Sequence, residues 1–412
     1  MSYNSRLDSL HPYPFAKLNQ LLAGVVADDG KKKISLAIGE PQHVPPEITL
    51  QALKDSLHSI TRYPSTAGEP ALRQSICDWL TKRYSLSDGL VTQENILPAL
   101  GTREALFAVA QTLVNVTGHE DVSNKPLVLM PSPFYQIYEG AAIMAGATPY
   151  YLPATQADEF KPDFSLVPES VWQRCQLFYI CNPSNPTGAV LTISEYQFLL
   201  EQARKYDFVI CSDECYSEIY LDEQAPVLGL LDAIESLSSN SLKQQSLQQA
   251  LVFNSLSKRS NLAGMRSGFV AGGSKLIERF LLYRTYHGSA MPLYHQQASR
   301  VSWADELHVQ ENRALYREKI IEACQLINSH KRLSVTVPEG GFCLWVAVSG
   351  CDQAFTKALY RQQNVVVLPG SYLARDIDGR NAGAGFVRIA LVQQKEQCLE
   401  AIARICKFAD IL

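Results

Sequence analysis

The sequence predicts an α/β protein with a large domain, built on a mostly parallel sheet covered by helices, and a smaller α+β domain. Two observations lead to this prediction. Short apolar runs alternate with helical patterns from about residue 46 to 295, which is typical of a parallel sheet with helices on both faces. The chain has 412 residues with 46% hydrophobic content, enough for two or three domains with buried cores.

The chain begins with a segment rich in Pro, Lys and Gly, residues 1–45, which we expect to form an arm and a strand. It holds one short helical run at 15–23 and ends in an apolar run at 34–41. The large domain is expected over 46–295, with strands at 95–99, 127–130, 148–152, 176–180, 208–211, 251–254 and 268–271. A stretch rich in Ser and Gln at 236–249 predicts a surface loop or a peripheral helix.

From residue 296 to 412 the pattern changes to one long helical stretch followed by short strands. We expect the helix at 301–329, strands at 333–337, 342–346, 365–368 and 386–391, and a closing helix at 395–409. This order predicts the smaller α+β unit.

Composition argues against several classes of function. A net charge of −4 gives no basic surface for nucleic acid. The ten cysteines are scattered without metal-ligand spacing, so Cys211 and Cys215 are interpreted as packing residues in a reducing compartment and no metal is expected. No run has the length of a signal-peptide core or a membrane span. We therefore expect a soluble, cytoplasmic protein without nucleic-acid or membrane partners.

Residues 255–268 are the part of the chain most informative about chemistry. They follow the apolar run 251–254 and are rich in small residues, which allow a backbone to approach a ligand closely. Ser255 and Ser257 offer hydroxyl donors, and Arg266 offers a planar fork suited to phosphate. A lone Lys258 would be interpreted as a solvated surface lysine. Beside these phosphate donors it is better interpreted as an amine nucleophile.

Two other loops add complementary groups. Asn185 lies in a proline-pinned loop after the run 176–180. Asp213 and Tyr216 follow the run 208–211, where α/β sheets bind ligands, although a helix N-cap would also explain the aspartate. Together with Lys258, these residues supply an amine, a carboxylate for a pyridinium nitrogen and donors for a phenolate oxygen. Pyridoxal phosphate needs these groups from a protein.

These motifs resemble those of the fold-type I, class I and II pyridoxal-phosphate aminotransferases, and the likeness runs over nearly the whole chain. It rests on NPTG at 185–188, DECY at 213–216, SLSK at 255–258, Arg266 and Arg388, in the family's order. Within the family, LHPYPF at 10–15, GTREALF at 101–107, PFYQIYEG at 133–140 and YRTYHG at 283–288 resemble the succinyldiaminopimelate aminotransferases. The resemblance implies that the two chain ends together form the small domain.

The start of the helical pattern after the run 95–99 is a second candidate phosphate site. Gly101, Thr102 and Arg103 would present free backbone N–H groups and the helix dipole there, although a plain strand-to-helix turn is the alternative. The resemblance adds Tyr63 as a phosphate ligand donated across a dimer interface, so it implies a homodimer with shared active sites. It also places Tyr135 against the cofactor ring, with Phe134 and Tyr138 as competing candidates that we interpret as core residues.

The resemblance assigns the remaining chemistry residue by residue. Lys258 holds the cofactor at rest and later moves a proton between the substrate and the cofactor. Asp213 pairs with the ring nitrogen, while Asn185 and Tyr216 donate to the phenolate oxygen. Arg388 would bind the substrate α-carboxylate together with the backbone of Gly39, although Arg388 in a structural salt bridge is the alternative.

The function implied is transfer of an amino group between an amino acid and 2-oxoglutarate, most specifically from succinyldiaminopimelate in lysine and diaminopimelate biosynthesis. Aspartate, aromatic or alanine aminotransferases and a β-lyase of the same fold are the alternatives. An effector-binding half of a transcription regulator is disfavoured, because the chain leaves no room for a DNA-binding domain. The cation that binds a distal carboxylate is left open among Arg62, Arg103, Arg259, Arg284 and His287.

Overall fold

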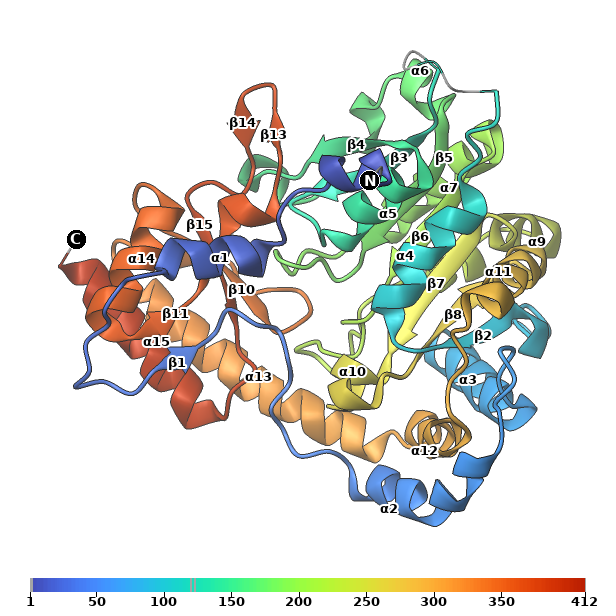
Figure 1. Ribbon diagram of the computed structural model, residues 1–412, viewed down its shortest axis with the longest axis horizontal. Coiled ribbons are helices and arrows are strands. Elements are labelled where there is room, and N and C mark those ends of the chain that lie inside the picture. Colours follow the sequence, from blue (N-terminus) through green and yellow to red (C-terminus); the bar gives the residue numbers. More distant parts are fainter. Residues whose placement is uncertain (1–2, 119–120, 122–123, 412) are drawn as a thin grey trace.

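The computed structural model describes residues 3–118, 121 and 124–411. Its large domain is built on a seven-stranded sheet: β2 (Ile96–Ala99), β3 (Leu127–Ser132), β4 (Thr148–Pro153), β5 (Cys175–Cys181), β6 (Val209–Asp213), β7 (Ala250–Ser255) and β8 (Gly268–Gly272). The strand order is β2-β8-β7-β6-β5-β3-β4 (Figure 1). Only β8 runs antiparallel to its neighbours in this sheet. The predicted mostly parallel sheet is confirmed, with every strand at a predicted apolar run.

Helices cover both faces of this sheet. One face packs against α4 (Thr102–Leu113), α5 (Ile137–Ala145) and α11 (Ser274–His287). The other packs against α3 (Pro70–Arg83), α6 (Glu169–Trp172), α7 (Ile193–Tyr206), α8 (Leu230–Glu235), α9 (Asn240–Leu247) and α12 (Leu293–Ala304), and α2 (Glu47–Ser56) lies against α12. In β5, Leu177 and Tyr179 belong to the first core, whereas Phe178 and Ile180 belong to the second. Because both faces are buried, the strand reads as a continuous apolar run.

The small domain has a four-stranded antiparallel sheet in the order β12-β15-β10-β9. Its strands are β9 (Ser334–Val335), β10 (Cys343–Ala347), β12 (Leu368–Pro369) and β15 (Phe386–Ala390), and its helices are α13 (Leu307–Asn328), α14 (Asp352–Gln363) and α15 (Lys395–Asp410). Two strand pairs complete it: β1 (Ile34–Ser35) with β11 (Val365–Val366), and β13 (Asp376–Ile377) with β14 (Arg380–Asn381).

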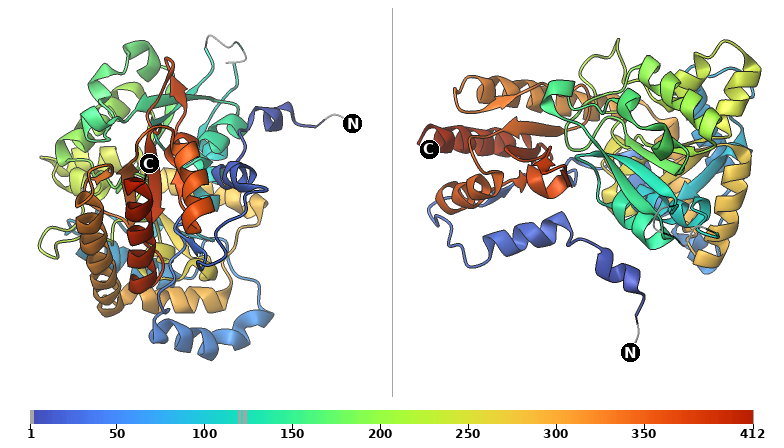
Figure 2. Two further views of the ribbon diagram at one scale, coloured as in Figure 1. Left: turned by 90° about the vertical axis from the view of Figure 1, so that its left-hand side faces the viewer. Right: turned by 90° about the horizontal axis from the view of Figure 1, so that it is seen from above.

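The N-terminal segment runs along one side of both domains (Figure 2). Helix α1 (Pro14–Leu22) packs through Leu18 into a small-domain cluster that includes Trp345 and Leu368. Further toward the N-terminus, the Arg6 guanidinium donates to the Met144 carbonyl of the large domain at 3.1 Å. Both chain ends therefore contact the small domain, and the arm also reaches the large one.

The single helix expected at 301–329 is in fact two helices, α12 and α13. The chain breaks at Asp305, which is extended and whose carboxylate accepts from the His308 backbone N–H at 3.1 Å. This contact satisfies one of the backbone N–H groups that have no partner within the helix at the start of α13. The expected domain boundary at 295 falls inside α12, which packs on α2 and α3 of the large domain. The division into domains stays a proposal, and this packing favours moving its boundary to 305–306.

The remaining elements are short. They are η1 (Ser5–Ser9), η2 (Leu57–Thr61), η3 (Gln93–Asn95), η4 (Gln156–Asp158), η5 (Phe164–Leu166), α10 (Leu256–Arg259), η6 (Ala263–Met265) and η7 (Gly370–Leu373). Helix α9 occupies the predicted loop-or-helix stretch 236–249, so the second alternative is the correct one. Within the described ranges, no helix is long and apolar enough to cross a membrane.

Candidate active site

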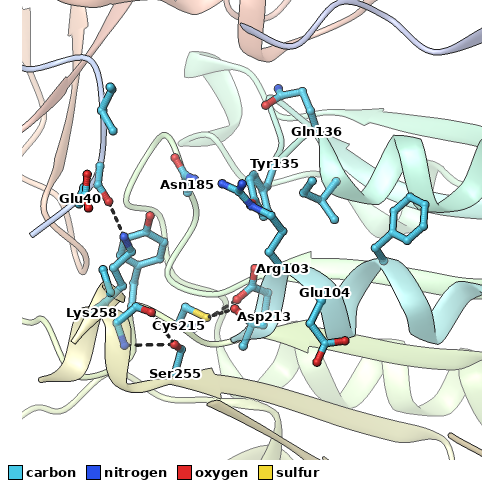
Figure 3. Close-up of a pocket in the computed structure, with 18 of the residues that line it drawn as sticks. Glu40, Arg103, Glu104, Tyr135, Gln136, Asn185, Asp213, Cys215, Ser255 and Lys258 are labelled. Carbon is cyan, nitrogen blue, oxygen red and sulfur yellow. Dashed lines mark hydrogen bonds between the residues drawn. The ribbon is translucent and has the colours of Figure 1, made fainter. Parts of the chain in front are cut away.

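A cavity of about 1000 Å³ opens where the parallel strands of the large domain end, and residues of the arm and the small domain complete its wall. Strands β6 and β7 deliver their last residues, Asp213 and Ser255, to this wall. Ligands of α/β sheets bind at this edge. Most of the sequence-predicted site residues line the cavity: Gly39, Thr102, Arg103, Tyr135, Asn185, Asp213, Tyr216, Ser255, Ser257, Lys258, Arg266 and Arg388. Several of them approach the same space from separate loops (Figure 3).

One end of the cavity gathers donors suited to a phosphate. The Ser255 hydroxyl lies 2.9 Å from that of Ser257. Gly101 does not line the cavity, but it begins α4 with φ +81, and a Cβ there would overlap the Arg266 guanidinium. Glycine at this position therefore lets the arginine lie against the helix start. The free N–H groups of α4, two hydroxyls and a guanidinium form an anion site.

Asp213 is a buried carboxylate, and no ion pair to it is found in the described part of the chain. The Tyr138 hydroxyl donates to its Oδ2 at 2.8 Å, and the Cys215 backbone N–H donates to its Oδ1 at 3.3 Å. Burial raises the pKa of Asp213, and these hydrogen bonds oppose the shift. A cation bound in the cavity would stabilise the ionised carboxylate.

Lys258 lies near the end of the short helix α10, and its ammonium group donates to the Gly39 carbonyl. The Phe342 ring lies beside it, with its centroid 5.4 Å from Nζ. Burial lowers the pKa of Lys258 to about 8, and the Arg388 charge acts in the same direction. An appreciable fraction of this lysine is therefore an uncharged, nucleophilic amine near neutral pH.

Arg388 projects from β15 into the opposite side of the cavity and is buried. It donates from Nη1 to the Asn185 side-chain oxygen at 2.9 Å and from Nη2 to the Ala37 carbonyl at 2.7 Å. Its Nε has no hydrogen-bond partner among the described residues. No carboxylate neutralises it there, so the structural salt bridge considered above is absent from the described residues. This leaves the guanidinium able to bind an incoming carboxylate.

The aromatic candidates are separated by their positions. Tyr135 lines the cavity, and its hydroxyl accepts from Arg103 Nε at 2.8 Å. Phe134 and Tyr138 are buried in the core instead. Tyr63 does not line the cavity and is fully exposed in this single chain.

The five candidate cations for a distal carboxylate also differ. Arg259 is buried among the Ser302 carbonyl and Glu306, and Arg284 is buried between the Pro98 carbonyl and Glu104. Both support packing and are not available to a substrate. Arg62 is exposed outside the cavity, whereas Arg103 and His287 line it.

Comparison with known proteins identifies the family. A family model described as aminotransferase class I and II matches residues 31–405. The chain belongs to this family. An aminotransferase crystal structure from Neisseria meningitidis is similar to it with a TM-score of 0.91 at 43% identity, covering 99% of this chain and 100% of the other. Another, from Helicobacter pylori, has a TM-score of 0.85 at 31% identity and full coverage of both chains.

Curated relatives cover the whole chain at lower identity. An LL-diaminopimelate aminotransferase from Dehalococcoides mccartyi is 29% identical over 99% of both chains. One from Natranaerobius thermophilus is 29% identical over 98% of both. The sequence likeness to aminotransferases is therefore confirmed, and the chain is an enzyme of this family.

Class I and II aminotransferases use pyridoxal phosphate, and the cavity residues fit this cofactor. The buried Asp213 has no cation partner among the described residues, which suits a protonated pyridine nitrogen. The cluster around Arg266 and the start of α4 suits the phosphate, and the Lys258 amine suits the aldehyde. In the described residues, no group of three or more His, Cys, Asp or Glu could hold a metal ion.

Three features of the site were missed by sequence reasoning. Tyr138 was interpreted only as a core residue, yet it hydrogen-bonds Asp213. Tyr13 and Phe15, from the start of the arm, line the cavity, as does Glu40. The LHPYPF string carried a signal for the arm, but it was used only as a family likeness. Nothing in the local sequence around Tyr138 indicates that its hydroxyl would reach the end of β6.

Proposed function

We propose that this aminotransferase transfers an amino group between N-succinyl-L,L-diaminopimelate and 2-oxoglutarate, with glutamate as the partner amino acid, in lysine and diaminopimelate biosynthesis. The motif likeness at the arm, α4, α5 and α11 supports the succinylated substrate. The names of the curated relatives support a diaminopimelate skeleton.

The balance of charge in the cavity wall is the main observation in favour of the succinylated substrate. Arg266 suits the phosphate, and Glu104 pairs with Arg284. Once these are set aside, Arg388, Arg103 and His287 remain to meet anions, against the single exposed carboxylate of Glu40. Succinyldiaminopimelate carries three carboxylates and one ammonium, which matches this surplus of donors. Arg388 binds the α-carboxylate, and the other two donors meet the distal and succinyl carboxylates.

We assign the cofactor-binding roles from the lining of the cavity and from the family resemblance. Ser255, Ser257, Arg266 and the backbone at the start of α4, from Gly101 to Arg103, would hold the phosphate, and the resemblance adds Tyr63 of a partner chain. Tyr135 would pack against the ring, and Asp213 would accept from the ring nitrogen. When bound, pyridoxal phosphate supplies the conjugated ring that withdraws electrons from the substrate α-carbon.

The reacting groups lie around the Lys258 amine. With the cofactor bound, the lowered pKa of this amine would suit it both to hold the cofactor and to carry the α-proton of the substrate as a base. Asn185 and Tyr216 would donate to the phenolate oxygen of the cofactor. Arg388 and the Gly39 backbone orient the substrate through its α-carboxylate, which points the α-hydrogen toward the lysine.

Unmodified L,L-diaminopimelate is the second candidate. The curated relatives carry this name, and the exposed Glu40 in the cavity wall could accept from a free distal ammonium. Succinylation replaces that ammonium by a neutral amide and adds a carboxylate. The unmodified substrate therefore requires an acceptor in the cavity wall for its distal ammonium, whereas the succinylated substrate requires an additional donor for its extra carboxylate.

Amine transfer to 2-oxoglutarate from succinyldiaminopimelate, L,L-diaminopimelate, aspartate, phenylalanine and alanine tests the proposal. We expect the highest kcat/KM for the succinylated substrate. A higher value for L,L-diaminopimelate would establish the second candidate. Equal or higher values for aspartate, phenylalanine or alanine would remove both while leaving the aminotransferase assignment intact.

We also propose that the enzyme is a cytoplasmic homodimer. Tyr63 is fully exposed next to the exposed side chains of Leu57 and Ile60, which suits a segment covered by a second copy. Unpaired cysteines, mostly buried, suit a reducing compartment. Light scattering at micromolar concentration tests whether the protein is a dimer. The variant Tyr63→Phe is expected to remain a dimer by this measurement and to bind the cofactor more weakly in a separate titration.

A further inference from the structure

A buried lysine outside the cavity has no carboxylate partner. Lys319, on α13, is 1% exposed and takes part in no ion pair within the described residues. Its Nζ lies 2.8 Å from His43 Nε2, 2.6 Å from the Leu391 carbonyl and 3.0 Å from the Gln393 carbonyl. The Tyr316 ring centroid lies 4.4 Å from the same nitrogen. Three acceptors match the three hydrogens of an ammonium group.

The hydrogen bonds leading from this lysine have one direction. Because Nζ donates to His43 Nε2, the imidazole must carry its hydrogen on Nδ1. Nδ1 lies 2.9 Å from the Asn312 side-chain oxygen, which also accepts from Asn261 at 2.9 Å. The Asn312 amide group is thereby turned toward the carbonyls of Lys258 and Arg259, both at 3.3 Å.

This series of hydrogen bonds ends at the last carbonyl groups of α10. This helix has only four residues, and α13 lies beneath it (Figure 1). The last carbonyls of a helix have no partner within the helix, so Asn312 satisfies groups that would otherwise leave the lysine backbone free to shift. A series of ring contacts also links His43 to Lys258. His43 lies 4.7 Å from Tyr316, and Tyr316 lies 5.3 Å from the Phe342 ring that contacts Lys258.

We propose that Lys319, acting through His43 and Asn312, is a positioning residue that fixes the backbone of Lys258. This rests on the proposed function in one respect, the role of Lys258 as the lysine that binds the cofactor. The charged form of Lys319 is required, since an amine with two hydrogens cannot satisfy three acceptors. If His43 Nε2 instead donated to a neutral Lys319, the neutral imidazole would have no hydrogen on Nδ1. Nδ1 would then face the Asn312 side-chain oxygen, and both atoms are acceptors.

Burial disfavours the charged form of Lys319 and lowers its pKa to about 8, and Cys398 on α15 opposes the shift. The ammonium form is still the major form near neutral pH, and the three acceptors around Nζ stabilise it. Burial also lowers the pKa of His43, as does the Lys319 charge, while the bond to Asn312 acts the other way; the net shift favours the neutral imidazole. Of the three carboxylates on the same helix, Glu318 and Glu322 pair with Lys395 at the surface, and Glu311 is exposed.

Two substitutions at His43 distinguish a hydrogen-bonding role, which positions Lys258, from a role in packing alone. His43→Phe keeps a ring against Tyr316 but removes the acceptor and the donor. His43→Gln keeps both in the same order. Asn95→Leu is the matched control, because Asn95 is also buried and donates to a backbone carbonyl, that of Gly272 at 2.8 Å, far from the cavity.

The measurements are kcat, KM and the pH titration of the visible absorbance of the holoenzyme. We expect His43→Phe to lower kcat about tenfold with little change in KM, because a displaced amine loses its alignment with the α-carbon. The midpoint of the absorbance titration should shift by roughly half a pH unit, since the environment of the attached amine changes. His43→Gln should restore both values toward those of the parent.

The proposal is overturned if His43→Phe matches Asn95→Leu in both readouts, or if His43→Gln is no closer to the parent than His43→Phe. If His43→Phe does not fold, Asn312→Asp decides, since a carboxylate there faces two carbonyls. An unchanged titration midpoint in it would also overturn the proposal. Borohydride reduction and peptide mapping of the parent test the premise separately: a label on another lysine removes the role of Lys258 itself.

Discussion

Replacing Arg103 by Gln should weaken acidic substrates and spare neutral ones. The Arg103 guanidinium uses Nε to bond the Tyr135 hydroxyl, and no hydrogen bond from its two terminal nitrogens is found among the described residues, so these can meet a distal carboxylate. A buried charged hydrogen bond would be worth about 1.5–3 kcal/mol, but this side chain is exposed and screened. We therefore expect a loss of about 1 kcal/mol, or about fivefold in kcat/KM.

Steady-state assays with succinyldiaminopimelate and alanine as amino donors measure this selectivity. Glutamine keeps a donor near the Tyr135 hydroxyl, so the position of Tyr135 in the cavity wall should not change. The kcat/KM for alanine should stay within about twofold of the parent, because alanine has no distal carboxylate. An equal loss for alanine would show that Arg103 serves the cofactor and not the substrate. No loss for either would show that another group, such as His287, meets the carboxylate.

Three further outcomes are expected. The rate at which cofactor-free protein binds pyridoxal phosphate should rise with pH up to about 8 and then level off, because burial lowers the pKa of Lys258 and only the neutral amine reacts. A rise continuing to 10.5 would mean that this lysine is solvated. Asp213→Asn should keep the fold yet slow the half-reaction about 100-fold in stopped flow, since a neutral amide no longer holds the ring nitrogen protonated; rates near the parent's would refute the pairing. Arg388→Lys should lower kcat/KM about 100-fold for amino donor and oxo acid alike, because both share the α-carboxylate and the site is buried; an effect on only one of them would contradict the assignment.

The inner strands of the large domain could be predicted because burial on both faces leaves a continuous apolar pattern within a single segment. The run 176–180 is apolar at every position but the first, so it indicates a central strand without reference to any other part of the chain. The break between α12 and α13 could not be predicted in this way. It depends on the Asp305 carboxylate turning back to His308 and on the buried Arg259 reaching the Asp305 carbonyl at 3.2 Å. The second of these contacts joins residues far apart in the sequence.

The same distinction applies to the site. Lys258, Asp213 and Asn185 stand in short motifs with distinctive composition, and these motifs lie at strand ends. The hydroxyl that supports Asp213 and the amide that supports the Lys258 carbonyl come from α5 and α13, at Tyr138 and Asn312. Each lies on a helix whose pattern indicates only which residues are buried. Which buried polar atom meets which partner is decided by how the helices pack on the sheet.

Asp213, Lys258 and Arg388 share one physical property: each is a wholly or partly buried ionisable group whose hydrogen-bond partners in the described residues are neutral. Burial raises the pKa of Asp213 and lowers that of Lys258, so in both cases the charged form is disfavoured. The buried Arg388 is held by an amide and a carbonyl, with one nitrogen still unbonded. A pyridinium nitrogen, an aldehyde and a carboxylate each remove one of these penalties. The ionisable groups that destabilise the cofactor-free protein are therefore the same groups that make the cavity selective for its cofactor and substrate.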